Sequence, residues 1–137
     1  MAARKTSKKD IPEILQGYEG LKEYIVKYAI GDYAEARKKL LAMEKYKQMY
    51  MDRYKKQYKH NAFYDSPEDK YEHEILKQKA IIAEVTSFFQ SQWCYALCEI
   101  DADPLIRFSE KKGMKLFENY AKLIEKRKSS GNEHKRA

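Results

Sequence analysis

The sequence predicts an all-α protein of about four helices, built around a long antiparallel helical hairpin with flanking helices in a bundle-like arrangement. Three observations support this fold class. Only five glycines and three prolines occur in 137 residues, of which 36% are charged, and this composition favours long helices over sheets and turns. Apolar residues recur at intervals of three, four and seven, the period of an amphipathic helix, without a strand-like alternation. Each proline closely follows a residue type that commonly caps a helix.

Helices are expected over residues 11–30, 33–60, 67–100 and 104–128. Three of them begin at a proline that follows an aspartate or a serine, at Asp10–Pro12, Ser66–Pro67 and Asp103–Pro104. Proline is tolerated in the first helical turn because the N–H group that it lacks would have no partner there. The preceding side chain accepts hydrogen bonds from the free N–H groups that remain.

The second helix is expected to begin after a break at Gly31. Glycine can end a helix in a left-handed conformation, and Asp32 with Glu35 has the spacing of a capping box. The connection His60–Asp65 is short, so helices 33–60 and 67–100 are expected to return antiparallel on each other.

The third helix is expected to supply much of the core. Its apolar stripe consists of Tyr71, Ile75, Ile82, Val85 and Phe89, widened by Leu76, Ile81, Phe88, Trp93 and Leu97. Cys94 and Cys98 lie one turn apart on the same face, without the geometry that a disulfide prefers. We expect them to be reduced thiols packed beside Trp93, which points to a cytoplasmic protein.

One domain is expected from the length of the chain. Residues 1–10 form a basic tail, residues 11–128 the helical domain and residues 129–137 a polar basic tail. Both tails are too polar to bury and are expected to be disordered on their own. The first ten residues lack the apolar stretch of a secretory signal, and no window approaches eighteen consecutive apolar residues, so no membrane association is expected.

The charge is unevenly distributed along the chain. Residues 37–60 carry nine basic and two acidic residues, and residues 107–137 carry ten and four. Residues 61–106 carry three basic and nine acidic residues, within a total net charge of +7. The positive charge is therefore concentrated in the second helix and in the carboxyl-terminal part.

The basic residues of the second helix alternate with tyrosines at every fourth position. Lysine and arginine neutralise phosphates, and tyrosine stacks on exposed bases, so this pattern is typical of a nucleic-acid-binding face. The predicted binding residues are Lys45, Lys47, Arg53, Lys55, Lys56, Lys59, Lys111, Lys112, Lys115, Lys126, Arg127 and Lys128, with Tyr50, Tyr54 and Tyr58 as stacking residues. In the alternative interpretation, the tyrosines are the buried stripe of the hairpin. The nearby carboxylates of Glu68, Asp69, Glu72 and Glu74 would then neutralise part of the charge.

Motifs of catalysis are missing from the sequence. It has no glycine-rich phosphate loop and no nucleophile elbow, and Glu72-His73-Glu74 lacks the second histidine of a zinc-protease helix. Cys94 and Cys98 have no further soft ligands near them in sequence. No catalytic residue, metal site or cofactor is expected.

We therefore expect a non-enzymatic small helical subunit that binds DNA or RNA within a larger or self-associated assembly. The alternative is a protein-interaction module, an inhibitor or assembly factor, whose basic, tyrosine-rich surface binds an acidic protein. A third possibility is a structural packing subunit of a capsid or similar particle. In size, helicity and basic ends the chain is similar to the small subunits of phage terminases and of CRISPR effector complexes, a likeness of architecture without a shared motif.

Overall fold

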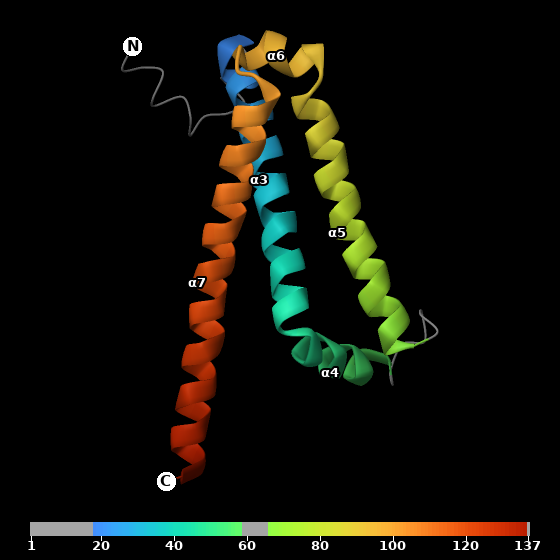
Figure 1. Ribbon diagram of the computed structural model, residues 1–137, viewed down its shortest axis with the longest axis vertical. Coiled ribbons are helices and arrows are strands. Elements are labelled where there is room, and N and C mark those ends of the chain that lie inside the picture. Colours follow the sequence, from blue (N-terminus) through green and yellow to red (C-terminus); the bar gives the residue numbers. More distant parts are fainter. Residues whose placement is uncertain (1–17, 59–65, 137) are drawn as a thin grey trace.

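The computed structural model describes residues 18–58 and 66–136, and these form helices and no strand (Figure 1). The helices are α3 (Tyr18–Lys45), α4 (Lys47–Tyr58), α5 (Pro67–Phe89), α6 (Gln92–Cys98) and α7 (Ala102–Arg136). The expected all-α fold class is confirmed. The helix start expected at Asp10–Pro12 and the amino-terminal tail lie outside the described residues.

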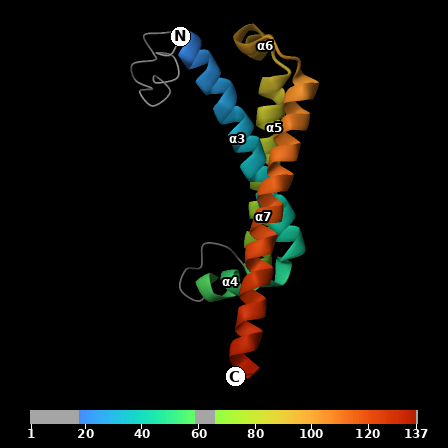
Figure 2. The same cartoon turned by 90° about the vertical axis from the view of Figure 1, so that its left-hand side faces the viewer.

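Three long helices run along the molecule, and two short ones cross its ends (Figure 1). α3 and α5 are antiparallel and in contact, so they form the arms of the expected hairpin. α4 bridges the arms at one end, and α6 carries the chain from α5 towards α7 at the other. α7 makes extensive contact with α3 and extends beyond α4 at its carboxyl end (Figures 1 and 2). None of the described helices is both long and apolar enough to cross a membrane.

The break expected at Gly31 is wrong, because α3 continues through it as a single helix. Gly31 has a negative φ, and a Cβ atom placed there would meet nothing within 4 Å. Glycine costs only about 1 kcal/mol relative to alanine inside a helix. Burial of Val26 on one side of the glycine and of Tyr33 and Ala34 on the other outweighs that cost.

The segment expected as one helix over residues 33–60 changes direction at Tyr46 instead. Tyr46 occupies a turn between α3 and α4, and α4 then runs across the end of the hairpin (Figure 1). No glycine or proline marks this turn. The Tyr46 side chain is buried, and its hydroxyl donates a hydrogen bond to Glu125 Oε2 at 3.1 Å. Tertiary packing of a single aromatic ring therefore accompanies the change of direction.

The segment expected as one helix over residues 67–100 is also divided. α5 ends at Phe89, and Ser91 caps α6 by accepting a hydrogen bond from Cys94 N at 3.1 Å. The same hydroxyl donates to the Phe88 carbonyl oxygen at 2.6 Å, so it satisfies both helix ends. α6 ends at Cys98, and its C-cap Glu99 has a left-handed φ of 57°.

The helix starts expected at the second and third prolines are confirmed. Ser66 is the N-cap of α5, and its hydroxyl accepts from Asp69 N at 3.0 Å. Pro104 lies in the first turn of α7, but this helix begins at Ala102, so Asp103 lies inside the first turn and is not the cap that was expected. The expected end of this helix at residue 128 is wrong, because α7 continues to Arg136.

The buried side chains form two clusters, one at each end of the hairpin. The α4-end cluster consists of Ala42, Met43, Tyr46, Tyr50, Met51, Tyr54, Tyr71 and Ile124. The α6-end cluster consists of Val26, Tyr33, Val85, Phe89, Cys94 and Leu105. Tyr71, Val85 and Phe89 are buried as expected, whereas Leu76 and Trp93 are 64% and 58% exposed and lie outside the core.

α3 and α7 approach each other closely at Gly113. A Cβ atom on Gly113 would lie 2.8 Å from Arg37 Cβ and 3.0 Å from the Ala34 carbonyl oxygen. Beside this contact, Glu110 Oε1 accepts hydrogen bonds from the Tyr33 hydroxyl at 2.6 Å and from Arg37 Nε at 2.7 Å. Burial raises the pKa of Tyr33, and the hydrogen bond to Glu110 adds to the rise. A glycine and a charge-assisted network therefore hold the two helices together.

Candidate nucleic-acid interface

The face of α7 that points away from α3 carries a row of cations. Arg107, Lys111, Lys115, Lys122 and Lys126 are all exposed, and their spacing places them along one side of the helix. The buried residues Leu105, Ser109 and Ile124 lie on the other side, against the rest of the molecule. At about 1.5 Å per residue, the row extends over about 28 Å.

We call these five residues the α7 row. None of the five forms an ion pair with a described residue. Glu118 interrupts the row between Lys115 and Lys122 and is itself exposed. Unpaired cations along one side of a helix present positive charge over an extended length, as a nucleic-acid strand presents its phosphates.

A second group of cations gathers around the ring of Tyr46, where α3, α4 and α7 meet. The Nζ atoms of Lys45 and Lys128 lie 5.7 Å and 5.5 Å from the centre of this ring. Lys47 Nζ lies 5.2 Å from the centre of the neighbouring Tyr71 ring. The fold thus brings together three predicted binding residues that come from the end of α3, the start of α4 and the far part of α7.

The remaining predicted residues of the second helix lie apart from this group. Lys55 and Lys56 are exposed in the last turn of α4, which runs away from α7 towards the start of α5 (Figure 1). Arg53 is exposed, and its guanidinium carbon lies 5.1 Å from the centre of the Tyr50 ring. The side chain of Tyr58 and all of Lys59 lie outside the described residues. The predicted site is therefore distributed over two surfaces.

The expected stacking residues of α4 are part of the core. Tyr50 and Tyr54 are only 7% and 6% exposed, and their rings contact each other with centres 6.2 Å apart. Burial raises the pKa of Tyr50, and the neighbouring Tyr120 hydroxyl adds to the rise. This placement favours the alternative that the sequence left open, in which the tyrosines form the buried stripe and the cations lie over their rings.

The expected neutralisation of α4 by acidic residues of α5 is not observed. Among the described residues, no ion pair joins Arg53, Lys55 or Lys56 to a carboxylate. Lys39 on α3 does pair with Glu74, with 3.9 Å between Nζ and Oε1. Glu68 and Asp69 lie in the first turn of α5, where the positive end of the helix dipole stabilises them.

Sequence reasoning missed Arg107, Lys122 and Phe108. Arg107 and Lys122 belong to the α7 row, and a search for basic residues at intervals of four along the last helix would have found Arg107 directly. Phe108 is 57% exposed beside the amino end of the row. Lys112, a predicted residue, is exposed beside the row rather than within it, and Arg127 is exposed farther along α7.

The two cysteines occupy different environments. Cys94 is fully buried and Cys98 partly buried, and neither is in a disulfide. Burial raises the pKa of the Cys94 thiol to about 11, with a smaller effect from Cys98, so the thiol is protonated at neutral pH. Within the described part of the chain, no group of three or more histidine, cysteine, aspartate or glutamate side chains is arranged to hold a metal ion.

Comparison of this chain with models of protein families, with curated proteins and with solved structures found no match.

Proposed function

We propose that this chain is a non-enzymatic helical subunit that binds the phosphate backbone of a nucleic acid through α7. The observation that carries the proposal is the α7 row, in which Arg107, Lys111, Lys115, Lys122 and Lys126 are exposed and unpaired among the described residues. The cations around Tyr46 extend the positive surface to the end of α3.

Contacts to phosphate rather than to bases account for the affinity in this proposal. Lysine and arginine that neutralise phosphates release counterions from the nucleic acid, and this release gives binding without sequence preference. Tyr50 and Tyr54 contribute to stability rather than to stacking, because their rings are buried. Phe108, at the amino end of the row, is the exposed ring best placed to contact an unpaired base.

The protein-interaction alternative loses part of its support in this structure. It depended on a surface that is both basic and rich in tyrosine, but Tyr46, Tyr50 and Tyr54 are buried. Interfaces between proteins are enriched in exposed aromatic residues, whereas phosphate contacts need only cations. Action within a larger assembly and a cytoplasmic location, supported by the free thiols of Cys94 and Cys98, remain parts of the proposal.

The test compares two triple variants with equal loss of charge. One carries Lys115→Gln, Lys122→Gln and Lys126→Gln in the α7 row, and the control carries Lys27→Gln, Lys77→Gln and Lys79→Gln at exposed positions on α3 and α5. Fluorescence anisotropy measures binding to duplex DNA, single-stranded DNA and RNA over a series of salt concentrations.

We expect the row variant to bind on the order of 100-fold more weakly at about 0.1 M salt, because it loses three phosphate contacts. The slope of log affinity against log salt concentration should also become shallower by about 0.9 for each lost contact. The control should retain most of the affinity, and the substrate that binds best identifies the class of nucleic acid. Equal losses in the two variants would show that only net charge matters. Absence of binding to all three substrates would refute the proposal.

A further inference from the structure

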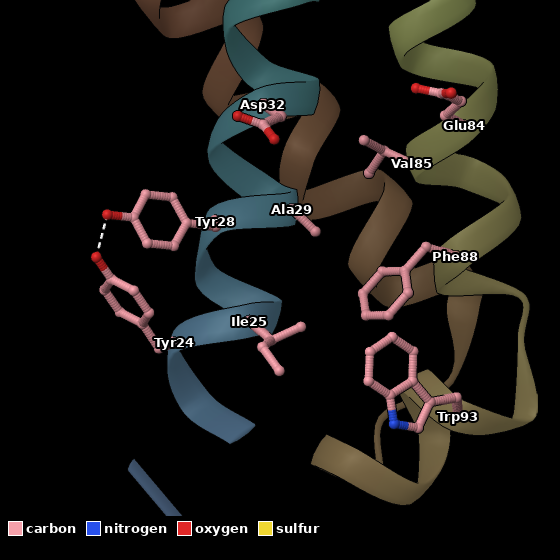
Figure 3. Close-up of a pocket in the computed structure, with 9 residues that line it drawn as sticks. All are labelled: Tyr24, Ile25, Tyr28, Ala29, Asp32, Glu84, Val85, Phe88 and Trp93. Atoms are coloured by element: carbon pink, nitrogen blue, oxygen red, sulfur yellow. Dashed lines mark hydrogen bonds between the residues drawn. The ribbon is translucent and has the colours of Figure 1, made fainter. Parts of the chain in front are cut away.

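A groove with apolar walls lies between α3, α5 and α6 (Figure 3). Its volume is about 370 Å³. Ile25 and Ala29 point into it from α3, and Val85 and Phe88 point into it from α5. This groove contains no residue of α7, so it is separate from the α7 row.

Trp93 from α6 closes one end of the groove. Its ring packs edge-on against Phe88, with ring centres 5.5 Å apart, yet Trp93 is still 58% exposed. Tyr24 and Tyr28 form the outer edge on α3, where their hydroxyls are hydrogen-bonded to each other (Figure 3). Exposed aromatic area beside a hollow is typical of a site where a partner inserts apolar side chains.

Two carboxylates lie on opposite walls at the other end of the groove. Asp32 belongs to α3 and Glu84 to α5, and both are exposed (Figure 3). Among the described residues, neither forms an ion pair. The groove therefore combines apolar walls with an unneutralised negative rim.

The rim charges limit what can occupy the groove. A nucleic acid and an anionic lipid surface are repelled by Asp32 and Glu84. A second copy that presented the same face would bring its own two carboxylates against these. The exposed part of α7 in a second copy is basic, and its large exposed apolar residues, Phe108, Met114 and Leu123, lie six and nine residues apart. They do not form the continuous apolar stripe that would fill the groove.

We propose that this groove binds a basic amphipathic helix of another protein. Aliphatic side chains on one stripe of that helix would pack against Phe88 and Trp93, in the mode in which a helix occupies an apolar groove. Lysine or arginine beside the stripe would pair with Asp32 and Glu84. The subunit would then contact nucleic acid through α7 and a protein through the groove, which connects the two in one assembly.

Trp93 provides the measurement, because it is the single tryptophan of the chain. The probe is a synthetic helical peptide with leucines at positions i, i+3, i+4 and i+7 and lysines at its other positions. The control peptide keeps the leucines and has glutamate in place of every lysine. Tryptophan fluorescence of the full-length chain is recorded as each peptide is added.

We expect a saturable change in Trp93 fluorescence with the basic peptide and none with the acidic one. The variant Asp32→Asn with Glu84→Gln should bind the basic peptide about tenfold more weakly, since it removes two partially screened charge pairs. The control variant Glu44→Gln with Glu72→Gln removes the same charge from exposed positions on the same two helices and should bind normally.

Four results would overturn the proposal. Equal binding of the two peptides, or equal weakening in the two variants, would mean that the rim does not select the partner. A Trp93 spectrum that changes with protein concentration, together with increased light scattering, would assign the groove to a second copy. A Trp93 spectrum altered by removal of residues 1–17 would assign it to the chain's own amino-terminal segment.

Discussion

The two ends of the hairpin contain buried clusters of different chemical composition. At the α4 end, tyrosines form the cluster, with hydrogen bonds from Tyr46 to Glu125 and from Tyr71 to the Met43 carbonyl oxygen, and with lysines over their rings. At the α6 end, Val85, Phe89 and Cys94 form a mainly apolar cluster beside an open groove, and Tyr33, hydrogen-bonded to Glu110, is its one tyrosine.

This difference determines what each end exposes. A buried tyrosine needs a polar partner and attracts cations to its ring, so the α4 end presents lysine and arginine to solvent. The α6 end has fewer such partners and leaves Tyr28 and Trp93 more than half exposed, with Asp32 and Glu84 at the rim. These exposed groups are the basis of the two proposals, that one surface binds phosphate and that the other binds a basic helix.

The largest effect on stability is expected from Gly113→Ala, which acts on the α3–α7 contact between the two ends. The new methyl group would meet Arg37 Cβ at 2.8 Å and the Ala34 carbonyl oxygen at 3.0 Å, atoms that cannot move without the backbone. We expect a loss of about 1–3 kcal/mol in the free energy of unfolding, measured by urea denaturation.

Gly31→Ala is the matched control, because nothing lies within 4 Å of its added methyl group. It should raise the free energy of unfolding by about 0.5–1 kcal/mol through better helix propensity. If both alanines stabilise the protein, the close approach of α3 and α7 is not present in solution.

A second prediction separates the buried thiol from the buried tyrosines by pH. Burial raises the pKa of Cys94, at the α6 end, from 9.0 to about 11, and burial also raises the pKa values of Tyr46 and Tyr71 at the α4 end above 10.0. The folded state then holds protons that the unfolded state has lost. The free energy of unfolding should fall above about pH 9, by up to about 1.4 kcal/mol per pH unit for each group.

Urea denaturation between pH 8 and pH 11 measures this fall. In Cys94→Ala, the fall should begin near pH 10 rather than pH 9, since only the tyrosines then contribute. An unchanged profile in this variant would mean that the thiol is accessible to water in the folded state.

The smallest effect is expected from Lys128→Gln, which removes a cation 5.5 Å from the centre of the Tyr46 ring. The free energy of unfolding should fall by about 0.5–1 kcal/mol. Lys122→Gln, on the α7 row, has no ring contact among the described residues and should leave stability unchanged. Equal effects of the two substitutions would indicate that the lysines at the α4 end do not stabilise the tyrosine cluster.

The sequence supported some parts of the candidate site better than others. Lys111, Lys115 and Lys126 were predicted and do lie in the α7 row, because charged residues on a surface helix remain in water whatever the packing. The sequence left two interpretations of Tyr50 and Tyr54 open, because a spacing of four residues is equally compatible with a buried stripe and with an exposed one. Trp93 was expected in the core and instead lines the groove.

The sequence by itself determined the helical class, the starts of α5 and α7 and the separation of positive from negative charge. These features depend on local chemistry: helix period, the cap at Ser66, the proline in the first turn of α7, and the order of charged residues. Only the tertiary structure decided that α3 runs through Gly31, that the chain turns at Tyr46 and Ser91, and that a groove remains beside Trp93. These features depend on contacts between residues far apart in the chain, whose energies exceed the local preferences that a sequence pattern reports.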